Sequence, residues 1–281
     1  SMNVKMWENQ NTIANVLKLK EQGIHFIGPN KGEMACGEVG YGKMASVQEI
    51  KKEIDYLLKP GILTGKRALV TSGPTIEQID PVRFISNNSS GKQGHAIADA
   101  LRRHGADTKL ISGPVNIKDP ENMKVTKVNS AEEMLHECRE SLPVDIAVFA
   151  AAVSDWKCSK TSNIKIKKTS ENDELNLNLE KNQDILKEIS TLNTNRPDLV
   201  IGFSLETDNL IETAKEKLKN KSCDWIVANG HYNGKESVFD SDMNSVKLVE
   251  NDNLEDWGYL TKNDIAEKLC IKISKFFNEA A

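Results

Sequence analysis

The sequence predicts an α/β fold: a doubly wound, mostly parallel, Rossmann-like sheet with helices on both faces and a small β excursion. From Arg67 onward, apolar segments of strand length alternate with helix-patterned segments, which is typical of a parallel sheet. The segment "DIAVFAAAV" (145–153) is apolar throughout, as expected of a parallel strand covered on both faces. The glycines of "SSGKQG" (89–94) precede a helix-patterned stretch, where such folds bind anions.

The first part of the chain has a different pattern. Residues 8–22 are expected to form an amphipathic helix, followed by a short strand or turn at "HFIGP" and a glycine-rich loop over 32–46. A second helix is expected near Val47–Leu58. The segment "KPGILTGK" (59–66) is rich in turn residues and is the best boundary candidate. We therefore expect two domains, residues 1–59 and residues 60–281.

The second part supplies the predicted sheet. Strands are expected at 67–73, 107–113, 145–153, 199–206 and 224–229, and helices at 91–104, 130–140, 184–190, 209–219 and 262–277. A hairpin is expected around Ser237–Glu250. Ser130 and Glu133 have the spacing of a capping box at a helix start. Between Lys157 and Leu179 the alternation stops, and the polar, basic excursion is expected to be functional or mobile.

Composition excludes several classes of protein. The 281 residues carry a formal net charge of −4, so no basic surface indicates nucleic-acid binding. No run of 18 apolar residues predicts a membrane span, and the N-terminus has no apolar signal core, so a cytoplasmic location is expected. The five cysteines are irregularly spaced without a C-x-x-C pair, which favours reduced thiols and argues against a zinc site.

The stretch "ISNNSSGKQG" (85–94) is typical of a loop that admits an anion to a helix N-terminus. A short-chain dehydrogenase would turn from strand to helix within a few residues, whereas a long segment separates Gly73 from Gly91. Those enzymes also use a Tyr-x-x-x-Lys pair. In this chain the residue four positions after each tyrosine is not lysine, but Ala45, Pro60, Glu236 and Asn263. No Tyr-x-x-x-Lys pair is therefore present.

A Walker A loop is also excluded. Gln93 follows Gly91-Lys92, and Ser86 stands where the first glycine belongs. A plain loop with a helix cap is the third interpretation. The intervening "GPTIEQIDPVRFISN" (73–87) mixes apolar with polar residues and is typical of a packed, shaped loop.

Three segments closely resemble the bacterial phosphopantothenate–cysteine ligase family. They are "TSGPTIEQIDPVRFISNNSSGKQGHAIA", "AAAVSDWK" followed by "KIKK", and "GFSLET" followed by "AKEKLKNKSCDWIVAN". The resemblance runs from about Lys66 to the C-terminus. It implies CTP-dependent ligation of 4'-phosphopantothenate to L-cysteine through an acyl-cytidylate, in coenzyme A biosynthesis, with Mg²⁺ as counterion and a homodimeric assembly. Whether CTP or ATP is used stays open on the residues alone.

The N-terminal segment resembles phosphopantothenoylcysteine decarboxylases, through "MNVKMW" (2–7) and "GEMACGEVGYGKM" (32–44). The resemblance implies that Cys36 donates a proton and that Asn3 handles the substrate carboxylate. The chain then corresponds to the tail of a decarboxylase domain joined to a whole ligase domain. The FMN-binding body is expected to precede Ser1, so we expect no decarboxylase activity from this chain alone.

The ligase resemblance assigns two catalytic residues. Lys165, which opens "KIKK", matches the essential lysine that stabilises charge on the acyl phosphate. Alternating lysine and isoleucine is also typical of a solvated edge strand. Asn87 matches the asparagine that binds the acyl-cytidylate, and a turn asparagine is the alternative.

The same resemblance assigns the nucleotide-binding residues, which are Lys165 again with Phe149, Ala150, Ala151, Asp155, Lys181, Asn182, Gln183, Asp184, Phe203, Lys217 and Lys221. Each has a structural alternative: strand packing for the alanines, core for Phe203, a helix N-cap for Asp184 and a solvated helix face for the last two lysines. Gln183 replaces the family's usual proline. Two rival functions remain, a short-chain-type NAD(P)-dependent dehydrogenase and a non-catalytic regulatory subunit on the same fold.

Overall fold

The computed structural model describes residues 2–22, 24–34, 37–58, 61–167, 175–206, 209–230 and 241–279. The chain divides into two compact units, Ser1–Pro60 and Gly61–Ala281. The N-terminal unit comprises α1 (Val4–Trp7), α2 (Gln10–Glu21), the antiparallel strands β1 (Asn30–Glu33) and β2 (Val39–Lys43), and α3 (Val47–Leu58). Among the residues of this unit whose burial is described, Ala45 is the one buried hydrophobic side chain outside glycine.

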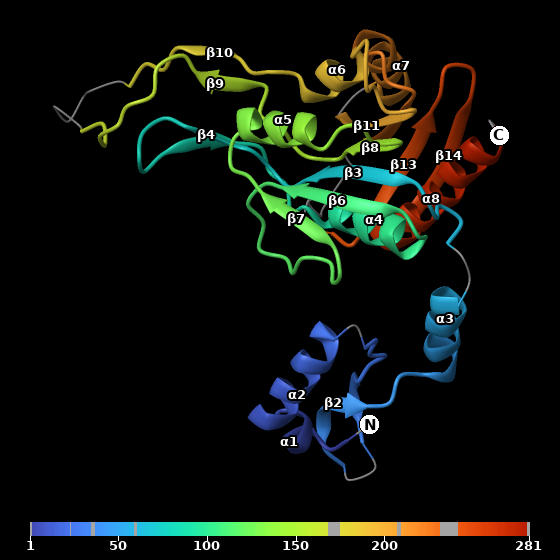
Figure 1. The fold of residues 1–281 in the computed structure, drawn as a ribbon. Helices are drawn as coiled ribbons and strands as arrows, with labels where there is room; N and C mark the ends of the chain where they lie inside the picture. Colours follow the sequence, from blue (N-terminus) through green and yellow to red (C-terminus); the bar gives the residue numbers. More distant parts are fainter. Residues whose placement is uncertain are drawn as a thin grey trace. The chain divides into compact units, whose positions relative to one another are not determined.

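The second unit is built on an eight-stranded sheet in the order β14-β13-β12-β11-β8-β3-β6-β7 (Figure 1). The six strands from β12 to β7 run parallel, and β13 and β14 are antiparallel to their neighbours. The mostly parallel doubly wound fold predicted from the sequence is confirmed. The strands are β3 (Arg67–Ser72), β6 (Asp107–Ser112), β7 (Lys124–Lys127), β8 (Ile146–Phe149), β11 (Leu199–Glu206), β12 (Trp225–Gly230), β13 (Met243–Val249) and β14 (Leu254–Thr261).

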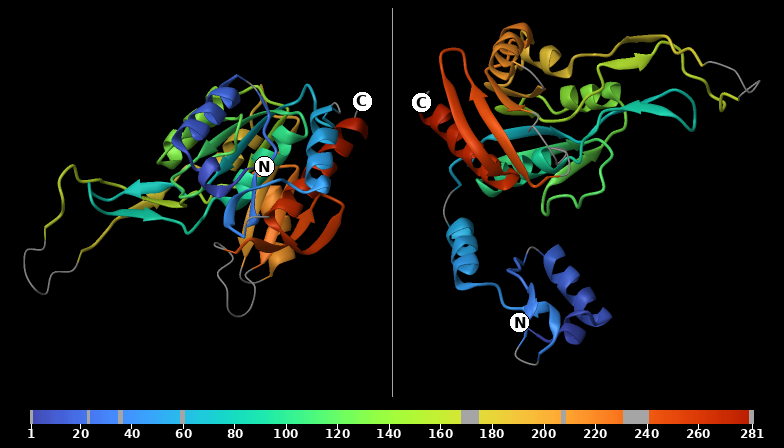
Figure 2. Two further views of the ribbon diagram at one scale, coloured as in Figure 1. Left: turned by 90° about the horizontal axis from the view of Figure 1, so that it is seen from below. Right: turned by 180° about the vertical axis from the view of Figure 1, so that it is seen from behind.

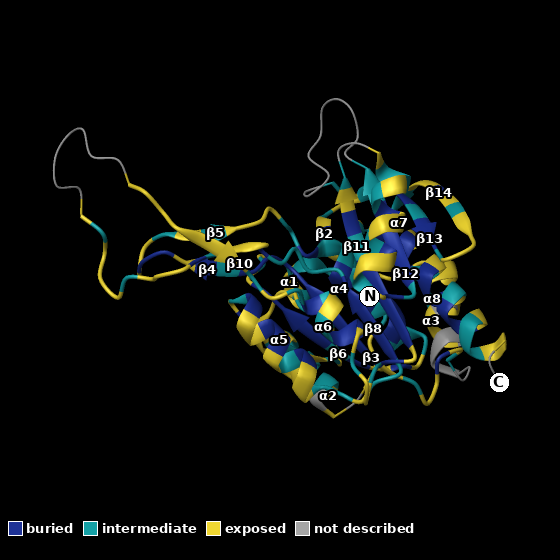
Figure 3. Cartoon of the chain, turned by 90° about the horizontal axis from the view of Figure 1, so that it is seen from above, coloured by how far each residue is buried: buried dark blue, intermediate teal, exposed yellow. Residues whose placement is uncertain are grey.

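Helices cover both faces of this sheet, and its central strands are buried (Figure 3). The alternation of side chains along β3 shows why. Val70 packs in the cluster that contains α4 (Lys92–Arg103) and α8 (Lys262–Glu279), whereas its neighbour Leu69 packs with α5 (Ala131–Glu140), α6 (Ile185–Ser190) and α7 (Leu210–Lys221). Both residues are fully buried, so each strand contributes to two cores.

Two short antiparallel ribbons form an arm that extends from the body of the second unit (Figure 2). One ribbon pairs β4 (Ile76–Gln78) with β5 (Phe84–Ser86), and the other pairs β9 (Trp156–Cys158) with β10 (Leu179–Lys181). The second ribbon is the small β excursion that the sequence predicts. Residues 168–174 of the excursion lie outside the described residues.

The local predictions mostly agree with the structure. Ser130 caps α5 by accepting a hydrogen bond from the Glu133 amide at 3.2 Å, and Asp184 caps α6 by accepting one from Lys187 at 3.1 Å. The predicted position of the hairpin, around Ser237–Glu250, is wrong. Its strands are β13 and β14, so the turn comes after Val249, where Glu250 N donates a hydrogen bond to Asn253 O at 2.9 Å.

Candidate functional site

A cleft of about 940 Å³ opens at the carboxyl ends of the parallel strands. From β3 the chain proceeds outward through β6 and β7, and it then returns to the other side of β3 to form β8, β11 and β12. The change of direction between β3 and β8 separates the loops that follow these two strands, and ligands bind at such points. The cleft lining includes Thr71 of β3, Phe149 of β8 and Phe203 of β11.

The N-terminus of α4 forms one wall of the cleft. Its N-cap, Gly91, has a φ of 74°, in the left-handed region that favours glycine, and no side chain caps the helix. Ser72 Oγ donates to Gly91 O at 2.9 Å and so ties this turn to the end of β3. A Cβ at Gly94 would lie 2.5 Å from Ser72 Oγ, so the helix approaches the strand closely only because residue 94 is glycine. The uncapped amides suit an anion.

His95, one residue beyond Gly94, contacts the same turn through its imidazole ring. Its Nδ1 lies 2.9 Å from Ser72 Oγ and 3.1 Å from Gly91 O, and its Nε2 lies 3.4 Å from Asp119 Oδ1. Burial lowers the pKa of His95, and the hydrogen bond with the Asp119 carboxylate only partly opposes that effect. Burial therefore favours the neutral imidazole at this position.

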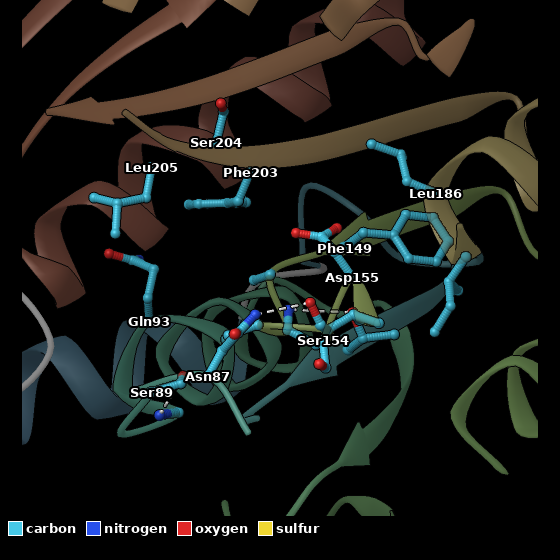
Figure 4. Close-up of a pocket in the computed structure, with 18 of the residues that line it drawn as sticks. Asn87, Ser89, Gln93, Phe149, Ser154, Asp155, Leu186, Phe203, Ser204 and Leu205 are labelled. Atoms are coloured by element: carbon cyan, nitrogen blue, oxygen red, sulfur yellow. Dashed lines mark hydrogen bonds between the residues drawn. The ribbon is translucent and has the colours of Figure 1, made fainter. Parts of the chain in front are cut away.

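Asn87 lies at the rim of the cleft, where two loops meet. Its Nδ2 donates to Val153 O at 2.9 Å, which links the loop after β5 to the loop after β8. Asn182 N donates to Asp155 O at 2.8 Å and brings the segment after β10 to the same place. In Figure 4 the side chains of Asn87, Asp155 and Phe203 surround one open space. An amide, a carboxylate and an aromatic ring thus face a common ligand volume.

Two lysines of α7 supply positive charge to the cleft. Lys217 Nζ lies 2.6 Å from Glu206 Oε1 and donates to Ser204 Oγ at 3.0 Å. Lys221 Nζ pairs with Asp184. Burial raises the pKa of Glu206, but its hydrogen bonds from Lys217 and Ser204 outweigh burial and leave that pKa below its usual value. These ion pairs therefore fix the positions of the two ammonium groups.

The structure brings most of the predicted site residues together. Those that line the cleft are Asn87, Phe149, Ala150, Ala151, Asp155, Lys181, Asn182, Gln183, Asp184, Phe203, Lys217 and Lys221. Lys165 is not among the lining residues; it is exposed on the arm. Cys36 lies outside the described residues, and Asn3, in the N-terminal unit, caps α1 by accepting from Met6 N at 3.2 Å.

Sequence reasoning missed the wall formed by the far end of the sheet. Asn229 of β12, Asn244 of β13 and Lys262 at the start of α8 also line the cleft. Asn244 and Lys262 are buried, and Gln93 Nε2 of α4 donates to Lys262 O at 3.2 Å. No motif marks these residues, because their strands and helix come from distant parts of the chain. An asparagine and a lysine on strongly apolar elements were the available signals.

Neither metal chelation nor membrane insertion is indicated by the described residues. No group of three or more His, Cys, Asp or Glu side chains among them is arranged to hold a metal ion. No described helix is long and apolar enough to cross a membrane. The cleft lining contains two carboxylates, Asp155 and Asp184. Since Asp184 pairs with Lys221, Asp155 is the better placed of the two to meet a cation carried in by a ligand.

Comparison with known families identifies both parts of the chain. Residues 63–277 match the profile described as the DNA/pantothenate metabolism flavoprotein C-terminal domain. Residues 1–59 match the profile described as flavoprotein. The boundary between the two matches falls in the same segment as the division between the two compact units.

Individual relatives agree with these matches. The coenzyme A biosynthesis bifunctional protein CoaBC of Haemophilus influenzae is 41% identical over 250 residues, covering 88% of this chain and 61% of the relative. A cysteine/cysteine sulfinic acid decarboxylase from an unidentified prokaryote is 38% identical, covering 97% of this chain and 77% of the relative. A crystal structure of the C-terminal domain of CoaBC superposes with a TM-score of 0.65 at 32% identity, over 78% of this chain and 99% of that one. The chain thus spans about three fifths of the length of the CoaBC relative.

Proposed function

The chain belongs to the family of the DNA/pantothenate metabolism flavoprotein C-terminal domain, and on that premise we propose that it ligates 4'-phosphopantothenate to L-cysteine at the expense of CTP. The product, 4'-phosphopantothenoylcysteine, is an intermediate of coenzyme A biosynthesis, the process named in the CoaBC relatives. The observation that carries the proposal is the convergence of Asn87, Asp155 and the two α7 lysines on one cleft.

The proposed reaction has two steps. The carboxylate oxygen of phosphopantothenate forms a bond to the α-phosphorus of CTP as the bond to the β-phosphate oxygen breaks, which gives an acyl-cytidylate and pyrophosphate. The cysteine amine then attacks the acyl carbon, loses a proton and releases CMP. Both steps gather negative charge, so the site needs cations and preorganised donors more than it needs a nucleophile.

The cleft offers groups suited to these tasks. Lys217 and Lys221 would exchange Glu206 and Asp184 for phosphate oxygens, and the uncapped amides of α4 would bind a further anionic group. Asn87 would orient the acyl-cytidylate from the rim. The small residues Ala150 and Ala151 let the backbone approach the base, with Phe203 packing against it. Mg²⁺ bound to the triphosphate would neutralise part of the phosphate charge, and Asp155 would face the metal ion.

We place FMN chemistry in the decarboxylase part of the longer relatives. The N-terminal unit matches the flavoprotein profile, but among its residues whose burial is described the one buried hydrophobic side chain is Ala45. They therefore do not form an apolar chamber for a flavin ring, and we derive no step through FMN. Asn3 and Cys36 keep their proposed roles for a chain that contains the whole decarboxylase domain.

We also propose that the protein works as a homodimer joined through the arm. Large apolar side chains are exposed along it: Val82, Phe84, Trp156, Ile164, Leu175, Leu177 and Leu179. Exposed apolar surface gathered on one projecting element is typical of an interface. A second copy would also bring Lys165 to a cleft, since Lys165 does not line the cleft of its own chain.

Pyrophosphate release tests the proposed function. The purified chain is mixed with 4'-phosphopantothenate, Mg²⁺ and either CTP or ATP, before and after cysteine is added. We expect release that depends on phosphopantothenate, is faster with CTP, and becomes steady turnover with cysteine. Lys217→Gln should reduce it strongly, whereas Lys215→Gln, an exposed lysine of the same helix outside the cleft, should not. Nucleotide binding without release would favour the regulatory function instead.

A further inference from the structure

The turn between β4 and β5 is built around a buried carboxylate. Asp80 Oδ1 accepts hydrogen bonds from Val82 N at 2.8 Å and Arg83 N at 2.9 Å. Asp80 Oδ2 accepts from Arg83 Nε at 3.0 Å and Arg83 Nη2 at 2.7 Å. The Asp80 side chain has no exposed surface. One oxygen therefore shapes the turn, and the other holds the guanidinium.

The same two side chains bind a segment far along the sequence. Ile166 N donates to Asp80 Oδ2 at 3.1 Å, and Ile166 O accepts from Arg83 Nη2 at 2.6 Å. Ser162 N donates to Ile79 O at 3.0 Å. Both main-chain groups of Ile166 are thus satisfied by one ion pair, and residues 162–166 are fastened to the Ile79–Arg83 turn.

Lys165 is the residue next to this attachment. Its side chain is exposed, and within the described part of the chain its Nζ makes no hydrogen bond or ion pair. Residues 162–167 form neither helix nor strand, so no ladder of backbone hydrogen bonds fixes them. The place of Lys165 is therefore set by the contacts of Ile166 and Ser162 with the turn.

We infer that Asp80, together with Arg83, is a positioning residue for Lys165: the buried ion pair holds the backbone of Ile166 and thereby fixes where the neighbouring ammonium can act. The inference rests on the proposed function and on the role that the family resemblance implies for Lys165, which is to stabilise the charge of the acyl phosphate. It makes the first half of the Lys157–Leu179 excursion a fixed part of the arm.

Charge explains why an aspartate occupies this position. Burial raises the pKa of Asp80, but five hydrogen bonds outweigh burial and bring that pKa to about 2, so the carboxylate stays ionised at any working pH. An asparagine at position 80 could still accept the Val82 and Arg83 amides through its oxygen. Its NH₂ group would then point at the guanidinium and at Ile166 N, where donors would face donors. Asp80→Asn therefore keeps the turn and releases the segment.

Limited trypsin digestion and kinetics of Asp80→Asn test the inference. Cleavage after Lys165 and Lys167 in the native protein should accelerate about tenfold or more, because charge-assisted hydrogen bonds that hold the segment are lost. The kcat of pyrophosphate release should fall by a similar factor of roughly ten, while the Kd for CTP changes less than about twofold. Arg83→Lys, which keeps a cation for Asp80 but removes the fork that reaches Ile166 O, should act in the same direction.

Glu180→Gln is the matched control, because Glu180 belongs to an exposed ion pair with Lys157 on the same arm. It should match the wild type in both assays. Wild-type cleavage in Asp80→Asn, or faster cleavage with unchanged kcat, would overturn the positioning role. If Lys165→Gln itself turned over normally, the proposed role of the lysine would fail, and the digestion would still report whether Asp80 holds the segment.

Discussion

At the scale of single residues, the cleft is held ready by contacts that a ligand must replace or join. Lys217 and Lys221 already have carboxylate partners, so their ammonium groups would lose little conformational freedom on binding the proposed phosphate. The side-chain Nδ2 of Asn87 donates to Val153 O, which leaves the side-chain Oδ1 to accept a hydrogen bond from a ligand. The site is therefore ordered by the protein before substrate arrives, which is the condition for electrostatic stabilisation.

His95 makes the stability of the second unit depend on pH. Its folded-state pKa lies below the ordinary value of 6.5, so between the two values the unfolded chain binds more protons. This contribution is complete above about pH 6.5 and is lost as the pH falls through that window toward the folded pKa. We expect His95→Gln to flatten the pH dependence of the unfolding free energy below neutrality, measured by urea titration. His136→Gln, on the exposed side of α5, should retain the wild-type slope.

The sequence predicted the site residues that lie in contiguous motifs. The family resemblance assigned Asn87, Asp155 and Phe203. Asp155 also follows a predicted parallel strand, and the ends of such strands converge at one edge of the sheet. Asn244 and Lys262 could not be found in this way, because their neighbours in the cleft are set by packing of α8 and β13. The sequence placed Lys165 in the excursion, but it did not indicate that this segment is attached to the β4–β5 turn through the hydrogen bonds of Ile166 with Asp80 and Arg83.

At the scale of elements, periodicity predicted the long strands and helices well. The strand β11 spans the predicted residues 199–206, and α4 begins one residue after its predicted start because Gly91 is the N-cap. The strand β7 and the β4–β5 ribbon were missed, since segments of three or four residues have too little alternation to be recognised. The terminal hairpin was misplaced because β13 alternates polar and apolar residues, as either strand of a hairpin does, so its pattern does not show on which side the turn lies.

Two residues of α8 allow a test of how this helix stabilises the sheet. Leu269 is fully buried in the cluster shared with α4, whereas Ile271 is 48% exposed. Leu269→Ala should lower the unfolding free energy by roughly 2–5 kcal/mol, since it removes buried methyl groups and leaves a cavity. Ile271→Ala should change it by about 0.5 kcal/mol or less. Equal losses in urea unfolding would mean that α8 does not pack as described.

At the scale of the whole molecule, the proposed catalytic groups are divided between body and arm. Asn87 lines the cleft in the body, whereas Lys165 lies on the arm. If the arm serves a second copy, a site needs one group from each chain. Mixing Lys165→Gln with Asn87→Asp, each inactive alone, should then restore up to about a quarter of wild-type turnover. Random pairing makes about half of the dimers mixed, and one of the two sites in each mixed dimer is intact.

That mixture needs two controls. Each variant mixed with wild type should show that subunits exchange, and light scattering should give the mass of a dimer. Lys217→Gln mixed with Asn87→Asp is the matched pair, because both residues line the cleft of one chain. In a dimer of these two variants, one cleft lacks Lys217 and the other lacks Asn87, so no wild-type site forms and no turnover is restored. Activity from neither mixture in exchanging dimers would contradict the proposed use of the arm.

The order of strands in the sheet also bears on how the protein is made. During synthesis β3, β6 and β7 leave the ribosome before β8, so the edge of β3 that finally pairs with β8 stays open while residues 73–145 are added. An unpaired apolar edge invites association with other nascent chains. The glycine turn at 89–94 emerges in that interval as well, but the opposite wall of the cleft arrives with β11 and α7. A nascent chain therefore lacks a complete cleft until most of the second unit has been translated.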